Sequence, residues 1–86
     1  MTVIEVIIKN KVGLHARPAA QFVKIAESFS AEIWITKDGM RVNGKSILSL
    51  LTLAAEEGCE LTLEAEGPDE KEALEALRGL LEEDGE

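Results

Sequence analysis

The residues whose types and spacing could do chemistry lie close together near the start of the chain, at His15, Arg17 and Pro18. Proline is tolerated in the first turn of a helix, where backbone N–H groups lack helical partners anyway, so we expect a helix to begin near Ala16. His15 then lies at the helix start, where unpaired N–H groups, including that of Ala16, and the positive end of the helix dipole attract anions. An imidazole placed there is a nucleophile that could take up a phosphoryl group, with the Arg17 guanidinium binding phosphate oxygens.

The surroundings of this imidazole disfavour a positive charge on the ring, so His15 is expected to remain a neutral nucleophile. Gly13 would suit such a site for two reasons, because a residue without Cβ lets the loop turn tightly and lets another protein come close to the ring. The alternative is a histidine that only caps the helix or lies on the surface. Spacing alone does not decide between these interpretations.

Apolar periodicity predicts the elements that must position these residues. Alternation predicts strands over 2–9, 31–37 and 59–66, and the Asp38-Gly39 turn predicts a hairpin that returns as a strand over 40–43. A helical period predicts helices over 16–28 and 47–53, the second capped by Ser46, and a last helix with an apolar stripe from Ala73 to Leu81. The predicted fold is a single α+β domain over 1–86, an antiparallel sheet with helices on one side and its other face open to water.

Composition excludes several classes of protein. The net charge is -8, with +3 on residues 1–55 and -11 on residues 56–86, which argues against a nucleic-acid partner. No apolar run is long enough to span a membrane, so no membrane partner and a cytoplasmic location are expected. One cysteine and one histidine form neither a disulfide nor a cluster with metal-ligand spacing, and no metal or cofactor is expected.

Two segments resemble the motifs of a known family: 13–19 (Gly-Leu-His-Ala-Arg-Pro-Ala) and 43–47 (Asn-Gly-Lys-Ser-Ile). Together they are similar to HPr, the histidine-containing phosphocarrier of the bacterial phosphoenolpyruvate-dependent sugar phosphotransferase system. The resemblance implies an open-faced β-sandwich with strand order 1-4-2-3 and three helices on one face. It also implies that enzyme I phosphorylates His15 on Nδ1, with phosphoenolpyruvate as the ultimate donor and Arg17 assisting. The phosphoryl group would then pass to enzyme IIA domains for sugar uptake.

The resemblance further implies a docking surface on the first two helices. The second helix is apolar on nearly all sides, so a patch of it should stay exposed for transient partners rather than pack in the core. The candidate docking residues are Ala20, Lys24, Ile47, Leu48 and Leu51. Ser46 corresponds to a serine that a dedicated kinase phosphorylates in some family members, although an N-cap role alone would explain it. Weak complexes of a monomer are expected.

Two residues depart from the expected pattern. Val12 stands where many family members have a small polar residue, so backbone donors would have to bind the phosphoryl group without help from that side chain. Trp34 is predicted on the open face of the sheet, where it either contacts a partner or another copy of the chain, or simply covers the sheet.

Competing functions remain open at this point. A regulatory HPr-like protein of a nitrogen-related phosphorelay or of carbon-catabolite control, acting by protein binding, would carry the same motif. A small scaffold in which His15 only caps a helix is a second alternative. A self-sufficient enzyme is disfavoured, because no second acid, base or metal group joins His15 in the motif.

Overall fold

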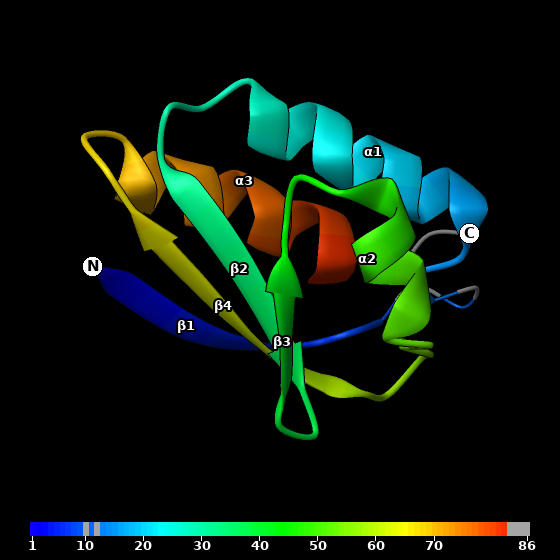
Figure 1. The fold of residues 1–86 in the computed structure, drawn as a ribbon. Coiled ribbons are helices and arrows are strands. Elements are labelled where there is room, and N and C mark those ends of the chain that lie inside the picture. Colours follow the sequence, from blue (N-terminus) through cyan, green and yellow to red (C-terminus); the bar gives the residue numbers. More distant parts are fainter. Residues whose placement is uncertain (10, 12, 83–86) are drawn as a thin grey trace.

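The described part of the chain forms four strands and three helices. The computed structural model describes residues 1–9, 11 and 13–82. Each predicted element is present, and the six elements for which bounds were predicted have their ends shifted by at most two residues. Among these residues no helix is long and apolar enough to cross a membrane. The elements are, in order, β1 (Thr2–Ile7), α1 (Ala16–Glu27), β2 (Glu32–Lys37), β3 (Met40–Asn43), α2 (Ile47–Thr52), β4 (Glu60–Glu66) and α3 (Glu70–Glu82) (Figure 1).

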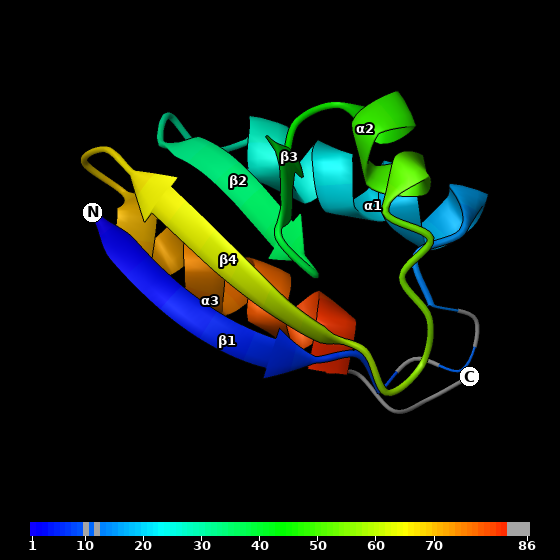
Figure 2. The ribbon, with the colours of Figure 1, turned by 60° about the horizontal axis from the view of Figure 1, so that its bottom comes forward.

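The strands form one antiparallel sheet in the order β1-β4-β2-β3, which confirms the order that the family resemblance implies. Helices α1 and α3 lie side by side against one face of this sheet, and α2 lies beside α1 near β3 (Figures 1 and 2). None of the helices described lies on the opposite face (Figure 2). The predicted α+β sandwich with one open face is therefore correct.

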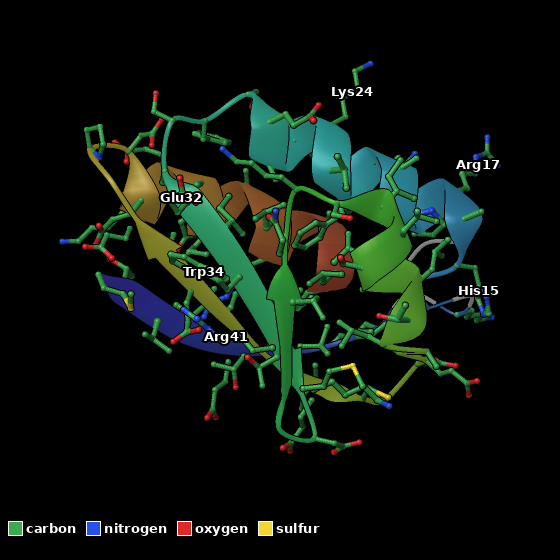
Figure 3. All side chains as sticks on the ribbon, viewed as in Figure 1. His15, Arg17, Lys24, Glu32, Trp34 and Arg41 are labelled. Carbon is green, nitrogen blue, oxygen red and sulfur yellow. The ribbon has the colours of Figure 1, made fainter. Side chains whose placement is uncertain are left out.

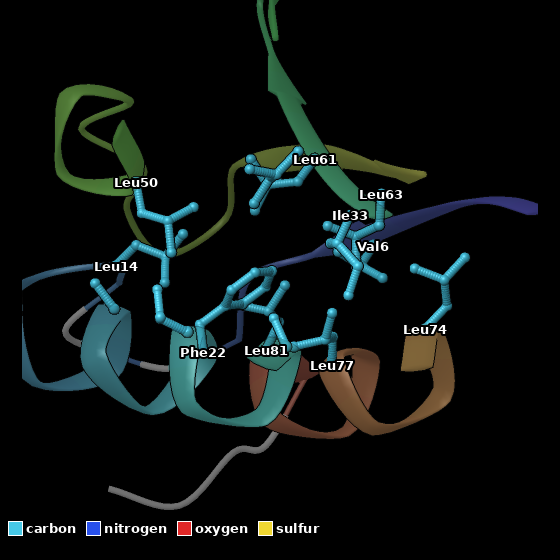
Figure 4. Close-up of a cluster of buried hydrophobic side chains, with 14 of the residues drawn as sticks. Val6, Leu14, Phe22, Ile33, Leu50, Leu61, Leu63, Leu74, Leu77 and Leu81 are labelled. Carbon is cyan, nitrogen blue, oxygen red and sulfur yellow. The ribbon is translucent and has the colours of Figure 1, made fainter. Parts of the chain in front are cut away.

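The core lies between the sheet and the helices. Alternate strand residues point into it: Val6 lies opposite Leu61, and Leu63 lies opposite Ile35. Phe22 of α1 is fully buried in the middle of this layer, and the stripe predicted on α3 packs beside it (Figure 4). Burying such side chains removes apolar surface from water and supplies most of the driving force for this arrangement.

The hairpin between β2 and β3 turns at the predicted dipeptide. Asp38 and Gly39 have φ values of 51° and 83°, and Lys37 pairs with Met40 across the turn. Two successive positive φ values match the right-handed twist of the flanking strands in a two-residue hairpin, and Asp-Gly adopts them readily. The turn fixes the register of β3 and hence the position at which the chain leaves the sheet towards α2.

Two carboxylates at the start of α3 tie distant parts of the chain together. Asp69 accepts hydrogen bonds from the backbone N–H groups of Ser30 and Ala31, both at 2.9 Å, and these bonds lower the pKa of its carboxyl group. Glu70 accepts a hydrogen bond from the Thr2 hydroxyl and one from the Gly67 N–H at 3.0 Å. The Thr2 bond first, and the Gly67 bond second, lower the pKa of Glu70 from 4.5 to about 2.

Because this pKa is depressed on folding, the contribution of Glu70 to stability is fully present above pH 4.5 and is lost as pH falls towards about 2. We expect Glu70→Gln to be less stable than the wild type at neutral pH and to differ little from it at about pH 2. Urea unfolding of both proteins at the two pH values measures this difference. If the free energies of unfolding of the two proteins differed by the same amount at both pH values, the loss of stability would not come from the ionised carboxylate.

Candidate functional site

His15 immediately precedes α1 and forms its N-cap. Its backbone is extended, with φ -84° and ψ -170°, and its carbonyl oxygen accepts a hydrogen bond from the Ala19 N–H at 2.8 Å. The imidazole is exposed and makes no capping hydrogen bond. The alternative in which this side chain serves to cap the helix is therefore wrong, and the ring is accessible to another protein.

The first turn of α1 offers backbone N–H groups that have no acceptor within the helix. Pro18 has no N–H, and Ala19 is the first residue of the turn whose N–H is paired, so those of Ala16 and Arg17 point out of the helix start. None of residues 16–19, all of them described, is acidic. The positive end of the helix dipole is thus left uncompensated, which favours an anion beside His15.

Arg17 adds a full positive charge to the same end of α1. Its side chain is exposed, and Figure 3 shows Arg17 and His15 at the same end of the helix, away from the open face of the sheet. The structure places them near one helix start without a hydrogen bond between their side chains, both of which belong to the described residues. A guanidinium on a flexible stem can swing to an anion on the ring, since it offers several donors in a planar fork.

The loop before His15 is anchored to the end of the segment that follows α2. The buried Leu14 donates its backbone N–H to the Ala55 carbonyl oxygen at 2.9 Å. Gly13 has φ +66°, and a Cβ there would lie 2.5 Å from the same oxygen. The expected tight turn is confirmed. The expected approach of another protein stays a prediction, and the backbone that lies close to Gly13 is that of Ala55 in the same chain.

The anchoring segment itself holds a strained residue. Ala54 has φ +51°, a left-handed conformation that costs an L-residue with a Cβ roughly 1–2 kcal/mol. We expect Ala54→Gly to raise the free energy of unfolding by about 1 kcal/mol, since part of the relief is offset by the greater freedom of glycine in the unfolded chain. Thermal or urea unfolding measures the gain. Ala76→Gly in the middle of α3 is the control, where the same replacement should destabilise by about as much.

Helix α2 leaves most of its apolar side chains in water. Only Leu50 of this helix is buried, whereas Ile47, Leu48 and Leu51 are exposed, Leu48 by 77%. We call these three residues the α2 patch. The prediction that this helix is too apolar to bury all its sides is confirmed, and Ala20 and Lys24 on the neighbouring α1 are exposed as well.

The second motif positions α2 through contacts that the sequence did not reveal. Ser46 caps the helix, its hydroxyl accepting a hydrogen bond from the Ser49 N–H at 3.2 Å, as predicted. The Asn43 side chain accepts the Lys45 N–H at 2.9 Å, and the Lys45 ammonium group donates to the Phe29 carbonyl oxygen at 3.0 Å. Lys45 therefore joins the segment just before α2 to the segment just after α1.

Two further predicted residues lie elsewhere. Trp34 is on the open face of the sheet, half-buried, as expected. Val12 lies outside the described residues.

An exposed imidazole at an uncompensated helix start lies beside an exposed apolar helix on an open-faced sandwich, an arrangement that suits a protein that holds an anionic group for a partner. The family described as PTS HPr component phosphorylation site matches residues 3–83. The chain belongs to this HPr family, and several of its relatives are named phosphocarrier proteins.

Individual relatives agree with this assignment. The phosphocarrier protein HPr of Neisseria meningitidis serogroup A is 50% identical over 78 residues, which cover 91% of this chain and 85% of the relative. The crystal structure of HPr from Bacillus anthracis superposes with a TM-score of 0.92 at 46% identity, covering 94% and 96% of the two chains. A crystal structure of the catabolite repression protein Crh of Bacillus subtilis, described as an intertwined dimer with a swapped domain, has a TM-score of 0.78 at 46% identity and covers 98% and 97%.

Proposed function

We propose that His15 is the residue that carries the phosphoryl group. Its Nδ1 lone pair attacks the phosphorus of the donor, and the bond from phosphorus to the donor breaks as the Nδ1–P bond forms. At the acceptor the same exchange runs in the other direction. The observation that carries this proposal is an exposed imidazole, making no capping hydrogen bond, at the N-cap of a helix without first-turn acids.

The N–H groups of Ala16 and Arg17 and the Arg17 guanidinium would bind the phosphoryl oxygens. Charge-assisted hydrogen bonds of this kind are stronger than neutral ones, and the exposed position lets the donor and acceptor reach the phosphorus from outside. Because His15, Ala16 and Arg17 are exposed, the bound group would not be enclosed and would stay within reach of the acceptor protein. This suits a carrier that must release what it binds.

We further propose that enzyme I and the enzyme IIA domains dock on one shared surface, made of the α2 patch together with Ala20 and Lys24 of α1. Both partners must approach the same imidazole, so they must use this surface in turn. An exposed apolar patch next to a positive site suits modest interfaces that release quickly. In the relay the protein would act as a monomer in the cytoplasm, where phosphoenolpyruvate is formed.

A charge placed in the α2 patch should weaken both encounters. We expect Leu48→Asp to slow phosphoryl transfer by roughly tenfold or more, because Leu48 is 77% exposed in the free protein and a carboxylate there would be desolvated at the interface. Steady-state transfer from enzyme I at varied carrier concentration measures the effect, which should appear mainly in KM. The matched control is Val3→Asp on the far face of the sheet, which should transfer at the wild-type rate.

Ser46 is proposed as a regulatory phosphorylation site for a dedicated kinase. A phosphate there would suit the start of α2, where the Ser46 hydroxyl already serves as N-cap. It would also place about -2 charge beside Ile47 and Leu48. Partner binding should therefore fall more than the stability of the fold.

The experiment that tests the proposed function is incubation with sugar-system enzyme I and phosphoenolpyruvate, followed by mass spectrometry. We expect one phosphoryl adduct per chain that is lost in acid, as a phosphoramidate is. The similarity to Crh favours one second candidate, a regulator of catabolite repression that acts by protein binding. Such a regulator should be labelled slowly or not at all by the sugar-system enzyme.

A further inference from the structure

The open face of the sheet is strongly acidic. Its outward-pointing residues follow from the register, in which Val3, Glu64 and Trp34 lie side by side on β1, β4 and β2. By the same alternation the face presents one guanidinium, that of Arg41, and five carboxylates, those of Glu5, Glu32, Glu60, Glu64 and Glu66. Five carboxylates and one guanidinium give this face a charge of -4, half of the chain's -8, and no helix of the described residues covers it.

Among the outward-pointing residues of the described strands the one cation, Arg41, is already engaged. The Arg41 Nε lies 2.8 Å from Glu64 Oε1, and its guanidinium lies 4.3 Å from the centre of the Trp34 ring (Figure 3). Within the described residues the other four glutamates take part in no ion pair. Glu32 lies directly opposite Glu66 in the register, and like charges in that position repel each other. The face therefore carries a repulsion that a positively charged partner would relieve.

Apolar groups lie among these charges. Val3 is 53% exposed and Ile7 45% exposed on the edge strand β1, and the half-buried Trp34 lies two strands away. A hollow of about 410 Å³ opens near the β2–β3 turn, with Thr36 and Thr62 in its wall. Three carboxylates line it, those of Glu5, Asp38 and Glu60, against the one ammonium group of Lys37, which pairs with Asp38 at 3.5 Å.

We propose that the open face docks a positively charged, partly apolar segment of another protein, with a Lys or Arg side chain in the hollow between Glu5 and Glu60. Charge complementarity selects this occupant. A second copy would bring the same acidic face against itself, and nucleic acid or an anionic membrane would be repelled. Apolar side chains of the segment would cover Val3 and Trp34, which remain accessible between the carboxylates.

The open face is separate from the surface that the relay would use, so a partner bound there goes beyond the proposed function. Figure 3 places Glu32, Trp34 and Arg41 on the sheet, away from the end of α1 that carries His15 and Arg17. A segment bound to the open face leaves the imidazole and the α2 patch accessible. A partner on the open face and a partner of the relay can then be bound at the same time.

The test uses a short synthetic peptide that alternates Lys and Leu, titrated into the isotope-labelled protein and followed by NMR. We expect shifts of outward-facing residues on β1, β4 and β2 and of the Trp34 indole. Replacing Lys by Glu in the peptide should remove them. The double variant Glu5→Gln, Glu60→Gln should bind the peptide about fivefold more weakly, as expected for two lost ion pairs.

The matched control is Glu27→Gln, Glu72→Gln, which removes the same charge from exposed positions on α1 and α3. Equal weakening in both double variants would overturn the proposal, since only net charge would then matter. Absence of shifts would overturn it as well, and so would shifts that grow with protein concentration alone, which would mark a second copy as the occupant. Phosphorylation by enzyme I should be the same in all variants, so this test is independent of the relay.

Discussion

Replacing His15 by Ala is expected to abolish phosphorylation by enzyme I and phosphoenolpyruvate. The chain has one histidine, so no second imidazole can take over. The side chain is exposed and makes no capping hydrogen bond, and the backbone carbonyl that pairs with Ala19 is unchanged by the replacement. Loss of transfer should therefore come without loss of folding, which mass spectrometry after incubation and circular dichroism together can show.

The informative companion is Arg17→Ala. It removes the guanidinium and keeps the nucleophile, so the adduct should still form, at a rate lower by roughly tenfold to a hundredfold if a charge-assisted bond to the phosphoryl group is lost. A His15→Ala protein that still acquires an acid-labile adduct would refute the assignment. An Arg17→Ala protein with an unchanged rate would leave the backbone amides as the sole phosphoryl ligands.

Replacing Gly13 by Ala is expected to destabilise the protein strongly, through two separate costs. Its φ of +66° costs a residue with a Cβ roughly 1–2 kcal/mol, and the added carbon would lie 2.5 Å from the Ala55 oxygen. Because that oxygen is held by the Leu14 N–H, the loop must shift, and overpacking of this kind costs about 1–3 kcal/mol. Urea unfolding should show a total loss of about 3 kcal/mol.

Gly39→Ala separates the two causes of that loss. Gly39 has φ +83°, but no atom lies within 4 Å of the position that its Cβ would take. It should therefore show only the conformational cost. Equal losses of stability at the two sites would mean that the loop around Leu14 moves away from Ala55 at no cost when a Cβ is added at position 13. In that case the contact between this loop and Ala55 would not be needed to position His15, and phosphoryl transfer by Gly13→Ala would be normal.

Local patterns predicted every element of the fold that the structure describes. Alternation and helical periodicity predict elements because they reflect which side of a segment is buried. The hairpin was predictable because Asp-Gly readily adopts the positive φ values that a two-residue turn requires. The strand order did not follow from those patterns. β4 pairs with β1 and β2, which lie far from it in sequence, and nothing in a single alternating strand states which neighbours it will have. That order came from the family resemblance.

For the site as well, the local features could be predicted from the sequence and the contacts between distant segments could not. Pro18 located the helix start, and with it the exposed N-cap position of His15. The hydrogen bond from Leu14 to the Ala55 carbonyl oxygen could not be predicted, because every residue has a backbone carbonyl and its partner does not depend on the residue type. The stacking of Arg41 on Trp34 was equally hidden, since it depends on the register between β2 and β3.

The central position of β4 sets the order of events during synthesis. β1 is made first, yet its partner in the sheet is the last strand of the chain, and the Ala55 carbonyl that holds the loop before His15 comes only shortly ahead of it. Such distant pairings make folding wait for most of the chain and slow it relative to a helical bundle. A nascent chain halted before β4 has emerged from the ribosome would therefore present the histidine motif without its support, and it should be a poor substrate for enzyme I.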